Sequence, residues 1–156
     1  MKIDEQVLMA LNQNIAVDLI AINQYFLHAR ILKHRGFEGL GKNLYKQSIA
    51  IMKEVDSLNE RVLLQEGIPM LDKLGELKIG DEVSQILACD IDLEKRRHIA
   101  LTRAIGLCEQ KSDFVSRSML QDYLTSCEEY IDYLETQEQM KNDLGVENYL
   151  QSISSC

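Results

Sequence analysis

The chain has 156 residues, a length typical of one domain. One proline and eight glycines provide too few turn signals for an all-β fold, and 46% hydrophobic residues exclude a disordered chain. A net charge of −8 argues against nucleic acid as a partner, because phosphate recognition requires a basic surface. No uninterrupted apolar run reaches the roughly 18 residues that span a bilayer, and the first residues lack a signal-peptide pattern. We therefore expect a cytoplasmic protein with no membrane partner.

Helical periodicity predicts four long helices along the chain. We expect them over residues 5–35, 43–66, 81–111 and 113–144. Gly36, Gly39 and Gly41 are expected to break the chain after the first helix, and Gly67 with Pro69 to end the second.

Capping signals define the later helices. Asp81 is the predicted N-cap of the third helix, and Ser112 or Asp113 is that of the fourth. Gly145 is expected to end the fourth helix, and residues 146–153 to form a short fifth one.

The connections define the fold class. Two short-loop helical hairpins are joined by a long connection over residues 67–80. This pattern predicts an all-α, ferritin-like four-helix bundle with one long crossover and a short fifth C-terminal helix. We expect a single domain over residues 1–156.

Two predicted inward stripes contain a carboxylate, Asp18 in the first helix and Glu94 in the third. A buried carboxylate must be paired, hydrogen-bonded or bound to a metal. One interpretation is a hydrogen bond to Tyr25, Tyr123 or Tyr130. The other is a metal centre inside the bundle.

The spacing of the two hairpins bears on that choice. Asp18 precedes Ile51 by the same number of residues as Glu94 precedes Cys127. Di-iron bundles place a Glu from each of two helices, and a Glu-x-x-His from each of the other two, around the metals. Here the first two positions hold carboxylates, whereas the other two begin with Ile51 and Cys127 and contain no His.

Five segments match a family pattern: residues 21–30, 66–69, 104–106, 133–136 and 145–151. On these segments the whole chain resembles bacterioferritin. The resemblance implies two-fold dimers that assemble into a twenty-four-subunit shell storing ferric iron. It also implies haem b at the dimer two-fold, with its iron bound by one Met of each subunit, and a di-iron ferroxidase centre in each bundle.

The chain departs from this family at the implied ferroxidase centre. Of the six ligand positions, Glu94 is unchanged and Asp18 retains a shorter carboxylate. The other four positions read Ile51, Glu54, Cys127 and Tyr130. Because bridged iron needs oxygen donors, we expect no working ferroxidase centre, so the subunit alone is not expected to be an enzyme. Asp18 and Glu94 are interpreted as remnant metal positions.

Met52 is the predicted axial ligand of the haem. It lies about 100° around the helix from Ile51 and so points away from the bundle interior. Neighbouring positions on the first two helices form an outward, largely apolar face, and the expected pocket residues are Leu19, Ile22, Asn23, Phe26, Tyr45, Ile49 and Asp56. Met packs adaptably, so plain interface packing is the alternative role of Met52.

We therefore predict a haem-binding shell subunit that acts beside a second, ferroxidase-competent subunit in a mixed shell. Its haem would pass electrons from a ferredoxin-type reductant to the ferric core and so release stored iron. One alternative is a purely structural shell subunit. Another is a ferroxidase with a retuned metal site, built from Asp18, Glu54, Glu94 and either His98 or Cys127.

Three further side chains have simpler interpretations. His98 follows Glu94 by one helical turn and is expected to be hydrogen-bonded in or near the core. Cys127 is expected to be a small apolar filler, because no basic neighbour is evident that would lower its pKa. Cys156 is the last residue and is expected to be exposed.

Overall fold

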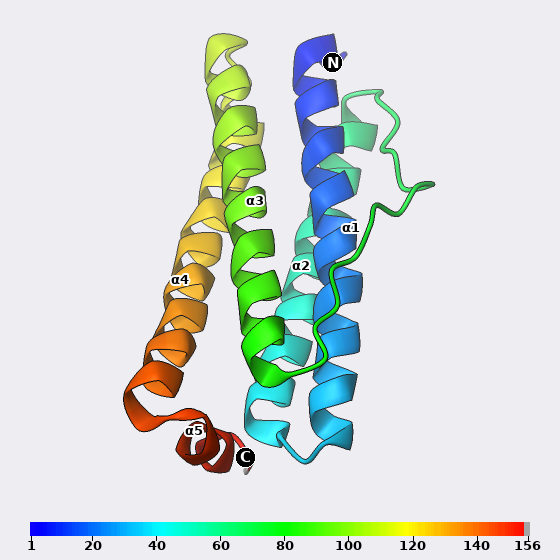
Figure 1. The fold of residues 1–156 in the computed structure, drawn as a ribbon. Helices are drawn as coiled ribbons and strands as arrows, with labels where there is room; N and C mark the ends of the chain where they lie inside the picture. Colours follow the sequence, from blue (N-terminus) through cyan, green and yellow to red (C-terminus); the bar gives the residue numbers. More distant parts are fainter. Residues whose placement is uncertain (155–156) are drawn as a thin grey trace.

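The computed structural model describes residues 1–154, which form five helices and no strands (Figure 1). The helices are α1 (Glu5–His34), α2 (Glu38–Leu64), α3 (Val83–Gln110), α4 (Phe114–Leu144) and α5 (Val146–Ser152). The all-α prediction is confirmed for this part of the chain. Cys156 lies outside the described residues.

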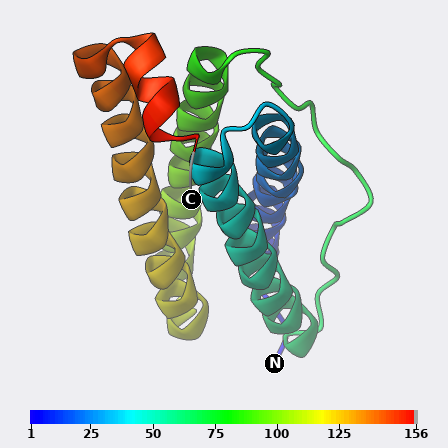
Figure 2. The ribbon, with the colours of Figure 1, turned by 90° about the horizontal axis from the view of Figure 1, so that it is seen from below.

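The four long helices form a bundle of two hairpins. Helix α1 packs against α2 and α3, and α3 packs against α4. The connection from α2 to α3 runs along the outside of α1, from one end of the bundle to the other (Figures 1 and 2). Helix α5 crosses the end of the bundle, where the Gly39 N–H donates to the Ile153 carbonyl at 2.9 Å. The predicted connectivity with one long crossover is confirmed.

Buried polar groups attach the crossover to the bundle. The Gly80 N–H donates to His28 Nε2 at 3.0 Å, and the opposite ring nitrogen of His28 lies 2.8 Å from Asp90 Oδ1. The Gln24 side chain donates to the same Asp90 oxygen and accepts from the Lys78 N–H, both at 3.0 Å. Two side chains of α1 therefore join the end of the crossover to α3.

Helix α2 begins earlier than predicted. It starts at Glu38, so the expectation that Gly39 and Gly41 break the chain is wrong. Gly41 lies where α2 approaches α1 closely, and an added Cβ would lie 3.2 Å from the Ala29 carbonyl oxygen. Gly36 does break the chain, because its φ of +87° suits a residue without a Cβ.

The start of α3 also differs from the prediction. Its N-cap is Glu82 rather than Asp81. The Gln85 side chain accepts from the backbone N–H groups of Asp81 and Glu82 at 2.9 and 3.3 Å, which satisfies donors that the helix leaves free. Asp113 is confirmed as the N-cap of α4, since its carboxylate accepts from the Ser116 N–H at 3.1 Å.

Helix α1 contains a long stretch of high average hydropathy, although no uninterrupted apolar run of membrane-spanning length is present. By length and composition it could cross a membrane, with a mean hydropathy of 1.2 over its most apolar stretch. Half of that stretch is buried inside the bundle, however. A core helix of a bundle explains this pattern, because such a helix buries more than one stripe of its surface.

Candidate functional site

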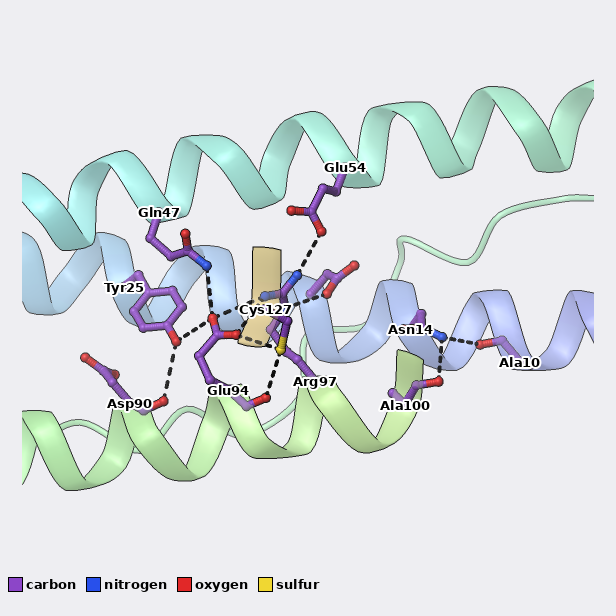
Figure 3. A network of polar contacts seen from close by, with 11 residues as sticks. Ala10, Asn14, Tyr25, Gln47, Glu54, Asp90, Glu94, Arg97, Ala100 and Cys127 are labelled. Atoms are coloured by element: carbon purple, nitrogen blue, oxygen red, sulfur yellow. Dashed lines mark hydrogen bonds and ion pairs between the residues drawn. The ribbon is translucent and has the colours of Figure 1, made fainter. Parts of the chain in front are cut away.

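A cluster of charged side chains lies in the centre of the bundle (Figure 3). Arg97 of α3 is only 1% exposed, and Asp18 of α1 and Glu94 of α3 are also buried. Arg97 Nε donates to Asp18 Oδ1 at 3.0 Å, and Nη1 donates to Glu94 Oε2 at 2.9 Å. Nη2 donates to Glu54 Oε1 of α2 at 3.0 Å. One guanidinium thus connects the carboxylates of three helices.

Glu94 is the most extensively hydrogen-bonded member of this cluster. Its Oε1 accepts from the Tyr25 hydroxyl at 2.7 Å and from Gln47 Nε2 at 3.1 Å. Its Oε2 accepts from Cys127 Sγ at 3.2 Å, in addition to Arg97. The predicted hydrogen bond from Tyr25 is therefore present for Glu94. The Tyr130 hydroxyl instead donates to Asn43 at 2.8 Å.

Burial and the guanidinium set the charge state of the cluster. Burial raises the pKa of Asp18 to about 6 and that of Glu54 to about 7, although Arg97 opposes both shifts. Burial alone would lower the pKa of Arg97, but Glu94, Asp18 and Glu54 hold it above its ordinary value. The guanidinium therefore stays charged at neutral pH.

Cys127 is a buried thiol rather than an available thiolate. Burial is the main reason that its pKa lies far above the ordinary value, and the nearby Glu94 carboxylate adds to the shift. The thiol is also close enough to the Glu94 backbone carbonyl, at 3.4 Å, to donate there. This state disfavours its use as a metal ligand. The prediction of an apolar filler without a basic neighbour is wrong, because the thiol donates to Glu94 inside the charged cluster and Arg97 lies close enough to affect its pKa.

The retuned metal site with His98 is not assembled. His98 is not in the core, because its side chain is 35% exposed and turns toward α4. There its Nε2 lies 2.8 Å from Glu128 Oε2, so the ring is hydrogen-bonded as expected but at the surface. Within residues 1–154, no group of three or more His, Cys, Asp or Glu side chains is arranged to hold a metal ion.

Sequence reasoning missed Arg97, which is the central residue of the cluster. The signal was its spacing, because Arg97 follows Glu94 by three residues and shares its face of α3. The buried positions Leu93, Arg97 and Leu101 follow helical periodicity as well. The predicted inward residue at this turn, His98, lies one position farther along α3 than the residue that is buried.

The second candidate site is the outward face of α1 and α2 around Met52. Met52 is 49% exposed, and Phe26 and Tyr45 are also exposed. The rings of Phe26 and Tyr45 lie 5.9 Å apart, centre to centre, and connect the two helices across this face. The Arg30 guanidinium lies 5.2 and 5.1 Å from the two ring centres.

The other predicted haem-pocket residues also reach the surface of the subunit. Leu19, Ile22 and Ile49 are half-buried, and Asn23 and Asp56 are exposed. No predicted pocket residue is fully buried inside this subunit. Their exposed surfaces are available to a ligand or to another subunit.

The bundle with buried carboxylates at its centre is of the ferritin-like class, and the model of the ferritin-like domain family matches residues 8–143. The chain is 34% identical over 146 residues to a bacterioferritin of Mycobacterium avium, a match that covers 94% of this chain and 92% of the relative. It is 33% identical to bacterioferritins of Streptomyces coelicolor and Brucella melitensis, over 96% of this chain and 90% and 92% of theirs. The chain therefore belongs to the bacterioferritin family.

Proposed function

We propose that this chain is a cytoplasmic iron-storage shell subunit that binds haem b through Met52 and does not oxidise iron itself. Membership of the bacterioferritin family supports a ferritin-like subunit for iron storage. The observation that carries the proposed haem binding is the exposed Met52 on the outward face of α1 and α2. A contiguous exposed apolar patch marks an interaction site, and Met52 shares this face with the exposed rings of Phe26 and Tyr45.

The residues around Met52 suit haem binding. A thioether is a soft ligand that favours reduced iron, so a haem bound by Met can carry electrons at a raised potential. Phe26 and Tyr45 provide aromatic surface beside the ligand, and Leu19, Ile22 and Ile49 provide aliphatic surface. A second copy of the subunit would supply the second Met and cover the rest of the haem.

The charges on this face favour a second copy in antiparallel orientation. Along α2, Asp56 and Glu60 follow Met52. Arg30 of α1 lies over Tyr45, which precedes Met52, and so forms the basic end of this face. A two-fold axis near Met52 would place the basic end of one copy on the acidic end of the other, which is favourable.

The centre of the bundle supports a division of labour between subunits. Its carboxylates are hydrogen-bonded to Arg97, and Ile51 is fully buried where the family pattern has a metal ligand. A shell of such subunits would need a second, ferroxidase-competent subunit to load iron. We propose that this chain supplies haem to that mixed shell, and that a ferredoxin-type reductant feeds electrons into it for iron release.

The experiment compares three shells expressed with adequate haem: wild type, Met52→Leu and Met9→Leu. Met9, in α1, is another exposed methionine and serves as the matched control. We expect one haem per two subunits, by Soret absorbance, in wild type and Met9→Leu and none in Met52→Leu. Haem retained by Met52→Leu would exclude Met52 as the ligand, and a haem-free wild type would favour the purely structural subunit.

Two further measurements test the other parts of the proposal. Homogeneous shells of this chain should oxidise ferrous iron no faster than the buffer alone. Rapid oxidation would favour a ferroxidase with a retuned site instead. Mass spectrometry of the native shell should resolve a second subunit, and a shell made of this chain alone would contradict the mixed assembly.

A further inference from the structure

The pair of iron ions implied by the family does not fit the centre of this bundle. The guanidinium of Arg97 lies among the carboxylates that would hold the metals (Figure 3). Each of its three nitrogens donates to a different carboxylate, Asp18, Glu94 or Glu54, at 3.0, 2.9 and 3.0 Å. These carboxylate oxygens are the donors that a hard cation would need.

The neighbouring side chains leave no alternative place for the two ions. Ile51 is fully buried and offers no donor atom. The Cys127 thiol is protonated and is itself a donor to Glu94. The Tyr130 hydroxyl is directed to Asn43 rather than to the cluster. The only group of opposite charge that the described contacts give the three carboxylates is Arg97.

We propose that the Arg97 guanidinium is a resident substitute for the metal. It is hydrogen-bonded to carboxylates from α1, α2 and α3 and denies their oxygens to divalent cations. In their present positions Asp18, Glu54 and Glu94 form no metal-binding group, but without Arg97 their freed oxygens would be able to close on one hard divalent cation. This inference rests on one part of the proposed function, the inactive ferroxidase centre. It gives the physical cause of that inactivity.

Arginine suits this task for two reasons. Its planar fork presents several donors in fixed directions and remains charged under all ordinary conditions, whereas a buried lysine readily loses its proton. It is also covalently attached, so the charge balance of the core does not depend on the supply of iron. The buried Asp18 and Glu94 and the largely buried Glu54, left with no cation, would be destabilising.

The test titrates Mn²⁺ into metal-free, assembled shells and follows the loss of the free-ion signal by electron paramagnetic resonance. Carboxylate oxygens suit Mn²⁺. The variants are Arg97→Met, Arg97→Met with Glu94→Gln, and Arg96→Met, which removes the adjacent, exposed arginine. We expect wild type and Arg96→Met to bind equal amounts, and Arg97→Met to bind one additional ion per subunit. The double variant should lose that ion.

Thermal unfolding gives the second readout. Added Mn²⁺ should raise the Tm of Arg97→Met. It should not change the Tm of wild type, of Arg96→Met or of the double variant. An Arg97→Met shell that assembles but binds no additional Mn²⁺ overturns the proposal. If that variant fails to assemble without metal, assembly on adding Mn²⁺ supports the proposal, and failure in both conditions overturns it.

The outcomes also separate this inference from the proposed function. An internal Mn²⁺ ion in wild type that Glu94→Gln removes would overturn both the resident arginine and the inactive centre. A wild-type shell without haem would overturn haem binding through Met52. It would leave the Mn²⁺ result for Arg97→Met as it stands.

Discussion

Arg97 of α3 donates a hydrogen bond of 3.0 Å to Asp18 of α1, although the two residues are 79 positions apart in the sequence. Both side chains are almost completely buried, at 1% and 3% exposure. A buried ion pair gains little over a well-packed apolar pair, but breaking it strands a charge in the core. The pair therefore stabilises the contact between α1 and α3 mainly because loss of either partner would leave an unpaired charge in the core.

This relationship predicts the result of a double-mutant cycle. Asp18→Asn removes one of the three carboxylates that contact Arg97, and because burial raises the pKa of Asp18 to about 6, the substitution should cost less than losing one partner of a lone buried pair. The coupling with Arg97→Met should be about 1–3 kcal/mol. Equilibrium unfolding in guanidinium chloride, at a fixed subunit concentration, measures both the destabilisation and the coupling free energy.

An exposed ion pair provides the control for this cycle. Lys95 and Glu135 lie 3.6 Å apart, with side chains 57% and 54% exposed. Their coupling should stay below about 1 kcal/mol, because solvent screens exposed charges. A coupling between Asp18 and Arg97 no larger than that of the exposed pair would contradict the role assigned to the buried one.

Glu54 should make stability depend on pH in an unusual direction. Burial raises its pKa from 4.5 to about 7 in the folded protein, despite the opposing attraction of Arg97. The folded state thus binds a proton that the unfolded state releases, so this residue's contribution to stability falls as pH rises through that interval. Glu54→Gln removes the effect, and the variant should gain roughly 2 kcal/mol over wild type between about pH 5 and pH 8.

Chemical unfolding of both proteins at the two pH values measures that gain. The comparison uses the difference between the proteins, so distant titrating groups cancel. Asp18 does not cancel, because it interacts with Glu54 and its own pKa is raised to about 6, so Asp18→Asn with and without Glu54→Gln is measured beside them. A variant that loses stability relative to wild type on going to the higher pH would show that Glu54 is stabilised as a carboxylate. That result would contradict a pKa of Glu54 above its ordinary value in the folded protein.

The periodicity of the sequence predicted the helices, and the two isolated carboxylates correctly marked the centre of the bundle. Asp18 and Glu94 stood out because each interrupts an apolar stripe. Arg97 did not, because helical spacing allows either Arg97 or His98 to follow Glu94 into the core. Which of the two side chains is buried depends on the facing helices. Carboxylates of α1 and α2 bind Arg97 inside the bundle, whereas His98 contacts the exposed Glu128 of α4.

The attachment of the crossover was equally hidden from the sequence. His28 lies within an apolar helix and is fully buried, yet its partners Gly80 and Asp90 come from distant segments. Periodicity predicts that such a residue is inside, but not what it contacts. The long crossover is therefore held by contacts that only the folded arrangement of α1, α3 and the connection reveals.

The His28 contacts predict that the end of the crossover becomes mobile when the ring is removed. In His28→Leu, the Gly80 N–H loses its acceptor, and the buried Asp90 loses a donor. We expect amide hydrogen exchange in the peptide over residues 75–82 to accelerate by about fivefold to 150-fold, as a lost hydrogen bond of 1–3 kcal/mol implies. His34→Leu, at the exposed end of the same helix, should leave exchange in this peptide unchanged. Equal exchange in wild type and His28→Leu would show that the ring does not hold the crossover, and that packing against α1 is enough.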